Sequence, residues 1–224
     1  MTLSDFEAAT KFTTPTSSST NLPVVEEEAA CSDVVALYDH FRTHFQRPDV
    51  PGILKCFATH PPLLKHMMEL SGSLIFSEGH LTRRHKEMIA TLVSSQNACP
   101  YCADSHSFAL RMTGASAEVL SAIQQDDLNS PALTLAEQAL LHFVSKVNSR
   151  SHEIARGDIE SLHRQGWNDL AIAEAIHVAA LFASFNRVVN AFGLPSQGLL
   201  AMFECSADPN EESVRSRTIR PKTT

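Results

Sequence analysis

Apolar side chains recur every three or four positions across most of this 224-residue chain, from about Ser32 to Phe203, and few β-branched residues alternate with polar ones. This period matches the 3.6-residue turn of an α-helix, so each such segment offers one apolar face for burial. No segment has the alternation of a convincing strand. The pattern therefore predicts an all-α fold, in which helices form a bundle around a common core.

Start and stop signals divide this region into separate helices. Thr82 and Asn168 are candidate N-caps, Thr134 and Glu137 form a capping box, and Gly114 is a candidate stop. The predicted helices cover residues 33–45, 61–76, 83–95 and 99–113, a segment after the capping box, then 169–192 and 198–203.

The composition, 43% hydrophobic and 19% charged, is that of one globular domain. We place this domain at residues 32–204. Residues 1–31 are expected to form a flexible N-terminal extension, because positions 13–20 contain only Ser, Thr and Pro. Residues 205–224 are expected to form a flexible polar tail.

The formal net charge of −7 and the pI near 5.8 argue against a nucleic-acid partner or an anionic membrane surface. No secretory signal is visible, and continuous apolar runs are far shorter than the ~20 residues of a membrane span. Five scattered cysteines do not form the dense framework of a small secreted domain. The protein is therefore expected to be soluble and intracellular, in the cytoplasm.

The most informative motif is Cys-Pro-Tyr-Cys at residues 99–102, followed by His106 and preceded by Glu87. On a helix, steps of three and four residues place Cys99, Cys102 and His106 on one stripe. Only a thiolate attacks a peroxide, and a thiol with a pKa of ~8.5 needs a base to form one. We expect His106 to be this base for Cys102, and Cys99 to resolve the sulfenic acid into a disulfide.

Residues 85–95, the 99–102 motif with Asn97 and Ala98 before it, and His106 resemble the core of the alkyl hydroperoxidase AhpD-like proteins, within the carboxymuconolactone decarboxylase superfamily. Residues 166–169, 174–177 and 185–193 are similar to the C-terminal half of its peroxidase-related branch. The resemblance implies an AhpD-like helical bundle with a CxxC-containing helix hairpin, which usually oligomerises, and a thiol-dependent peroxidase activity.

Carried over to this chain, the resemblance implies that Cys102 attacks the hydroperoxide, Cys99 resolves it, His106 is the base and Glu87 feeds a proton relay. One position departs from the family pattern. Tyr101 stands where the alkyl hydroperoxidases carry a further histidine, and a phenol with a pKa of ~10 cannot shuttle protons in the same way.

The resemblance also implies partners. The resulting disulfide needs an external dithiol, which in related bacterial enzymes is carried by a lipoyl-bearing protein, and a homotrimer or hexamer is the family's assembly. The chain has no nicotinamide or flavin signature, so we expect no cofactor, and no metal.

Alternatives remain open at this stage. A glutaredoxin also carries Cys-Pro-Tyr-Cys, but after a strand. Zinc bound by Cys99, Cys102 and His106 would lack a fourth ligand. A cofactor-free enzyme of the same superfamily, or a redox-sensing protein without turnover, would use the same fold.

Several single residues have structural interpretations. Buried carboxylates need partners, so Glu87 is a candidate ion pair with Arg187. His177 lies on an apolar helix and is expected to be a core histidine bonded to the backbone. The remaining cysteines, Cys31, Cys56 and Cys205, are expected to be passive.

Overall fold

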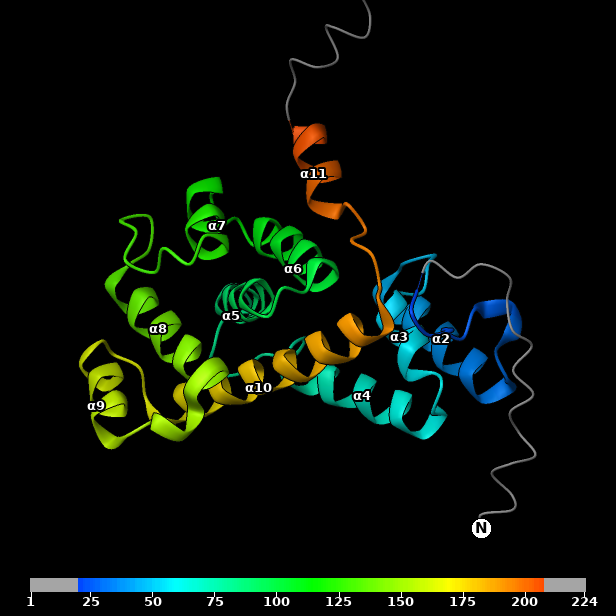
Figure 1. Cartoon of the computed structure of the whole chain (residues 1–224), viewed down its shortest axis with the longest axis horizontal. Coiled ribbons are helices and arrows are strands. Elements are labelled where there is room, and N and C mark those ends of the chain that lie inside the picture. The colour runs from blue at the N-terminus through cyan, green and yellow to red at the C-terminus, as the bar shows by residue number, and fades with distance from the viewer. Residues whose placement is uncertain (1–19, 208–224) are drawn as a thin grey trace, which may run out of the picture.

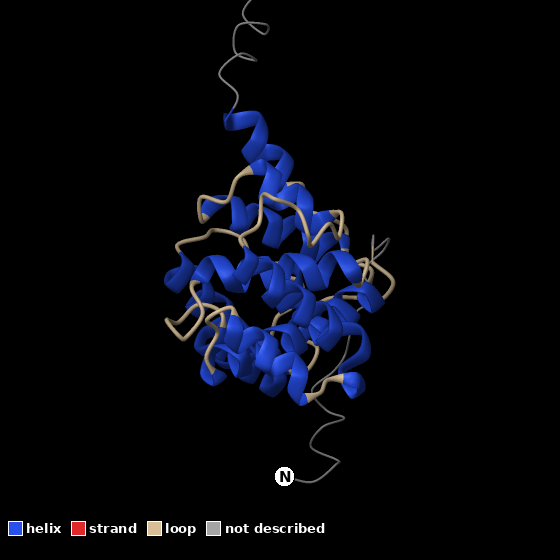
Figure 2. Ribbon diagram, turned by 90° about the vertical axis from the view of Figure 1, so that its left-hand side faces the viewer, coloured by secondary structure: helices blue, strands red, loops and turns tan. Residues whose placement is uncertain are grey.

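The computed structural model describes residues 20–207, and every regular element within them is a helix (Figures 1 and 2). The all-α prediction is therefore confirmed. The helices are α2 (Ser32–Phe45), α3 (Gly52–Phe57), α4 (Pro61–Leu74), α5 (Arg83–Gln96), α6 (Pro100–Met112), α7 (Ala117–Gln124), α8 (Leu135–Arg150), α9 (Arg156–Arg164), α10 (Asp169–Phe192) and α11 (Leu199–Ala207), with short 3₁₀ turns η1 (Glu27–Ala29) and η2 (Ser151–Glu153).

The expected caps explain where the long helices begin. The Thr82 hydroxyl accepts the His85 backbone N–H, and Asn168 accepts the Ala171 N–H at 2.9 Å. Thr134 and Glu137 form the reciprocal capping box at the start of α8. These bonds satisfy backbone donors that the first turn of a helix leaves without partners. Helices α3, α7 and α9, each of fewer than ten residues, were not predicted.

Helix α5 is the centre of the bundle. Nine consecutive residues of α5, 86–94, are buried, which requires neighbours on every side. Figure 1 shows α5 end-on, with α6, α7, α8 and α10 arranged around it. A residue on α5 is therefore held by packing from several helices at once, which makes this helix a rigid support for a site.

Helix α10 is the longest element and crosses the whole bundle. By length and composition it could span a membrane, but more than half of its most apolar window is buried inside the protein. Its apolar composition is thus explained by its place in the core. The helix ends at Gly193, whose φ of 75° favours glycine and whose Cβ, if present, would lie 2.8 Å from the Asn21 side chain.

The ordered domain begins before residue 32. The Asn21 backbone N–H donates to Phe192 O at 2.7 Å, and the Val25 N–H donates to Lys55 O at 3.1 Å. Val25 is buried, and its carbonyl accepts the Tyr38 hydroxyl at 2.8 Å. Residues 21–31 are therefore bound to α2, α3 and α10, in place of the flexible segment expected there. The remainder of the expected extension, residues 1–19, and of the tail, residues 208–224, lies outside the described residues.

A buried ion pair fixes the connection between α4 and α5. Lys86 is 1% exposed, and its Nζ lies 2.7 Å from Glu174 Oε1 while donating to the carbonyls of Leu74 and Ser77. Glu174 also accepts the backbone N–H groups of His80 and Leu81. All three ammonium protons thus have acceptors, and the connection is bound to both α5 and α10.

Candidate functional site

The two motif cysteines lie where α5 turns into α6. The chain leaves α5 through Asn97 and Ala98, and Ala98 has the left-handed φ of 48° that a tight reversal needs. The Cys99 backbone N–H then donates to Ser94 O at 2.9 Å, and Cys99 is the N-cap of α6. Pro100 follows at the first helical position, where its missing N–H costs nothing.

Cys99 and Cys102 are reduced and nearly inaccessible, with 1% and 4% of their surfaces exposed. The Cys102 thiol hydrogen-bonds the Cys99 sulfur, which also receives the Cys102 backbone N–H. The Cys102 thiol bond outweighs burial and lowers the pKa of Cys99, whereas the same bond, together with burial, raises the pKa of Cys102. The two thiols therefore titrate as one coupled pair, and the hydrogen bond between them favours the thiolate on Cys99.

Glu87 and His106 form the second half of the site. His106 Nδ1 lies 2.7 Å from Glu87 Oε2, and the Arg83 guanidinium donates to Oε1 at 2.6 Å. Glu87 is fully buried. Burial disfavours its charge, but the attraction and hydrogen bonds of His106 and then of Arg83 outweigh this and lower the pKa of Glu87. In the neutral form of His106, the Nδ1–H donates to the ionised Glu87, which leaves Nε2 with a lone pair.

The structure therefore brings the four predicted residues together as two pairs. Cys99 contacts Cys102, and Glu87 contacts His106, whose ring also packs edge-on against Phe182 with centroids 4.4 Å apart. The groups that perturb Cys102 are Cys99, Asn186 and Cys56, and His106 is not one of them. The proton step between His106 and Cys102 stays a prediction, which rests on their positions one turn apart on α6.

The suggested ion pair between Glu87 and Arg187 is wrong. Arg187 is exposed and donates to Ala183 O within its own helix. The cation beside Glu87 is Arg83, one turn earlier on α5. The i, i+4 spacing of Arg83 and Glu87 is visible in the sequence and could have identified this partner. His177 is exposed on the described surface, so the expectation of a core histidine is also wrong.

Tyr101 hydrogen-bonds the start of helix α3. Its phenol oxygen accepts the Ile53 backbone N–H at 3.4 Å, at the start of α3. Burial raises the pKa of Tyr101 to about 12, so the phenol stays protonated at neutral pH. The residue in the position of the family histidine thus attaches the motif to α3 and does not titrate in the physiological range.

The third cysteine of this region, Cys56, packs in the same apolar cluster as Cys99 and Cys102. Burial raises the pKa of Cys56 to about 12, so its thiol is a weak nucleophile. Cys31 and Cys205 are exposed and lie outside this cluster. Within residues 20–207, no three His, Cys, Asp or Glu side chains come together as a group that could hold a metal ion.

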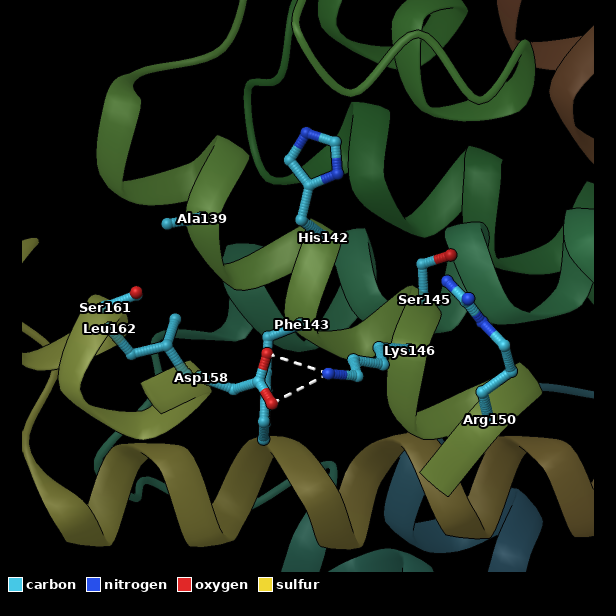
Figure 3. A pocket seen from close by; sticks show the side chains of 9 residues that line it. All are labelled: Ala139, His142, Phe143, Ser145, Lys146, Arg150, Asp158, Ser161 and Leu162. Carbon is cyan, nitrogen blue, oxygen red and sulfur yellow. Dashed lines mark hydrogen bonds and ion pairs between the residues drawn. The ribbon is translucent and has the colours of Figure 1, made fainter. Parts of the chain in front are cut away.

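Two hollows in the described part of the chain have walls that include neither Cys99 nor Cys102. One, of about 340 Å³, opens between α8 and α9 around the Lys146–Asp158 ion pair (Figure 3). The other, of about 510 Å³, is polar and is lined by the ends of α5, α7 and α8. Its wall includes Gln96, Asn97 and Asn148, whose amides lead toward the cysteines.

The comparisons with known proteins agree with this geometry. The model of the carboxymuconolactone decarboxylase family matches residues 61–141, which include both cysteines, Glu87 and His106. A structure of an uncharacterized peroxidase-related protein with an alkylhydroperoxidase AhpD core, from Ralstonia eutropha JMP134, aligns with a TM-score of 0.73 and 25% identity, over 83% of this chain and 96% of that one. This chain belongs to the AhpD/carboxymuconolactone decarboxylase superfamily.

Other solved AhpD-like structures extend the likeness. An uncharacterized peroxidase-related protein from Silicibacter sp. TM1040 is 25% identical, with a TM-score of 0.72 over 84% of this chain and 98% of its own. The debrominase Bmp8 in complex with 2,3,4-tribromopyrrole has the same fold at 17% identity, with a TM-score of 0.66 and the same coverage. Among curated proteins, no sequence matches this chain. The AhpD-like fold thus supports more than one chemistry.

Proposed function

We propose that this protein is a thiol-dependent peroxidase that reduces hydroperoxides through Cys99 and Cys102, with Glu87 and His106 as its proton relay. The observation that supports this most is the coupled pair of reduced thiols at the start of α6, one turn from a histidine whose proton is held by an ionised carboxylate. A redox centre needs both parts: two sulfurs within bonding reach, and a base for their first proton.

The proposed reaction begins when His106 Nε2 takes the first proton of the thiol pair, leaving one proton and one negative charge on the two sulfurs. The remaining proton moves from Cys102 to Cys99 along their hydrogen bond as Cys102 attacks the terminal peroxide oxygen. The O–O bond breaks, and the leaving alkoxide takes the proton from His106. The products are an alcohol and the sulfenic acid of Cys102.

The second half of the reaction closes the disulfide. The Cys99 sulfur attacks the Cys102 sulfenic acid, and hydroxide leaves with the thiol proton as water. One hydroperoxide has then gained two electrons, and two thiols have lost them. An external dithiol, which we propose to be of the lipoyl type, exchanges with this disulfide and restores both thiols. Assembly into a homo-oligomer belongs to the same proposal.

Peroxide consumption with excess dihydrolipoamide tests the function. We expect saturable turnover in the wild type, and loss of turnover in Cys102→Ser and in Cys99→Ser. Thiol counting should show two fewer thiols per chain after oxidation without reductant. Cys56→Ser is the matched control, because Cys56 lies in the same apolar cluster and has no role in the reaction; it should retain turnover.

Three outcomes would contradict the proposal. Full activity in the double variant lacking Cys99 and Cys102 would indicate a cofactor-free enzyme. A disulfide that forms reversibly with no turnover, for any dithiol donor, would indicate a redox sensor. Activity retained in Cys102→Ser and lost in Cys99→Ser would reverse the two roles.

A further inference from the structure

Asn186 is a fully buried side chain of α10 that faces the turn between α5 and α6. Its Nδ2 donates to Ser94 Oγ at 3.0 Å, and its side chain also hydrogen-bonds the sulfurs of Cys99 and Cys102. Its Oδ1 accepts Asn97 Nδ2 at 3.0 Å. A buried amide with every group satisfied is held in one position, and part of this one is directed at the two reacting atoms.

A chain of amides determines which end of Asn186 meets the sulfurs. Asn97 exchanges two hydrogen bonds with Asn148, at 3.1 and 3.2 Å, and Asn148 donates again to Gln96 Oε1 at 3.1 Å. Gln96 Nε2 donates to the Asp126 carboxylate at 2.8 Å, so Gln96 presents its oxygen to Asn148. This fixes the orientation of Asn148 and then of Asn97, whose NH₂ group is directed at Asn186. Only the oxygen of Asn186 can accept that group, so its own NH₂ group faces Ser94 and the cysteines.

The surroundings make this donor important. The sulfurs lie in an apolar cluster with Val189 and Leu194, where a charge has few other ways to be stabilised. The hydrogen bond to Cys99 and burial raise the pKa of Cys102 overall, and the hydrogen bond from Asn186 opposes this rise; at Cys99 the Asn186 bond acts in the same direction as the bond from Cys102 and favours the thiolate. Because Asn186 contacts both sulfurs, it can follow the negative charge when the charge moves from one to the other.

We propose that Asn186 is a thiolate-stabilising residue of the redox pair, which donates its amide N–H to the charged sulfur in the resting state and during attack. The proposal deepens the proposed function and rests on the Cys99–Cys102 pair being redox-active. Asn186 lies in the family-like segment 185–193, but the sequence alone gave it no role at the cysteines, from which it is more than 80 positions away.

The first test is a pH titration of thiolate ultraviolet absorbance in a background of Cys31→Ser and Cys205→Ser, which removes the two exposed thiols. Asn186→Leu keeps the approximate size of the side chain and removes the donor. We expect its first thiol midpoint to rise by about one pH unit, and alkylation by iodoacetamide at pH 7 to slow about tenfold, as for loss of a hydrogen bond to a charged group. Val189→Ala, in the same cluster and helix, is the control for packing damage and should leave the midpoint unchanged.

A second variant keeps the proposal testable if Asn186→Leu does not fold. Asn97→Asp offers only carboxylate oxygens to Asn186, so the Asn186 amide must turn its NH₂ group toward residue 97 and its oxygen toward the sulfurs. We expect the same upward shift of the thiol midpoint. The thiol–disulfide equilibrium against dithiothreitol should move toward the disulfide in both variants, because the reduced, charged state loses its donor.

Wild-type midpoints in both variants would overturn the proposal, as would an equal shift in Val189→Ala. These readouts use no peroxide. Failure of peroxide turnover would therefore contradict the proposed function alone, whereas unchanged midpoints in an active enzyme would contradict the role of Asn186 alone.

Discussion

Glu87 and Glu174 are carboxylates on neighbouring helices that make similar ion pairs, but we expect them to have different roles, one in the reaction and one in stability. Both are largely removed from solvent, with 0% and 11% of their side chains exposed, and their cationic partners lower the pKa of each against the opposing effect of burial. The difference lies in the partner. All three protons of Lys86 have acceptors, whereas the pairing of His106 with Glu87 uses only Nδ1 of the imidazole.

Burial and a shifted pKa therefore do not by themselves identify a functional group. Both features appear wherever a helix core must hold a charge. What distinguishes Glu87 is that its partner retains capacity to accept a proton and lies one turn from the cysteine pair. The Glu174 pair has no such capacity, and it instead holds the α4–α5 connection in place.

We expect the largest effect from the loss of the Glu174 side chain, and we expect it on stability. Glu174→Ala leaves the buried Lys86 charge and two backbone N–H groups without their acceptor, and we expect a loss of about 3–5 kcal/mol in the free energy of unfolding. Denaturant unfolding followed by circular dichroism measures it. Glu69→Ala, at an exposed pair with Lys65, should cost less than about 0.5 kcal/mol. Equal losses of unfolding free energy in the two variants would show that the buried Lys86–Glu174 pair is no more important for stability than an exposed one.

The next effect is on turnover. Glu87→Gln keeps the shape of the side chain but removes the charge that holds the His106 proton on Nδ1. We expect peroxide turnover to fall about 10²-fold or more, as for loss of general base catalysis, with a smaller loss of stability than in Glu174→Ala. Glu118→Gln, at a fully exposed carboxylate, should be unchanged. A Glu87→Gln enzyme with wild-type turnover would remove Glu87 from the relay.

The decrease of the free energy of unfolding at acid pH should reflect both the Glu87 and the Glu174 ion pairs. The folded pKa of Glu174 and of Glu87 lies below the unfolded value of ~4.3, so each contributes stability that is fully present above that pH. This stability is lost as pH falls through the folded pKa. We expect the free energy of unfolding to decline less steeply below about pH 5 in Glu174→Gln than in the wild type. Parallel declines in the two proteins would show that this carboxylate is not shifted.

The smallest effect concerns Tyr101. Tyr101→Phe removes a long hydrogen bond to the start of α3, and we expect a loss of no more than about 1 kcal/mol in stability. Turnover should stay within about twofold of the wild type, because a phenol that remains protonated takes no part in the relay. A loss of turnover comparable to that in Glu87→Gln would instead place the phenol in the reaction.

Much of the fold could be predicted because its signals are local. The period of apolar residues and the caps at Thr82, Thr134 and Asn168 depend on neighbours within one or two helical turns, and they identified the long helices. The short helices α3, α7 and α9 escaped this reasoning, since segments of six to nine residues are shorter than the window of about 11–18 residues over which an apolar period is assessed. The burial of Val25 was not predicted either, because one or two apolar residues in a polar segment do not show in the sequence whether they pack against the core.

The candidate site divides along the same line. The close approach of Cys99 and Cys102 and the position of His106 on their helix follow from local spacing alone, because a regular helix converts spacing into direction. Only the tertiary structure decided that Glu87 meets Arg83 and His106 rather than Arg187, that Lys86 meets Glu174, and that Asn186 faces the sulfurs. Such contacts join residues that are mostly far apart in the chain, and they depend on how whole helices pack around α5.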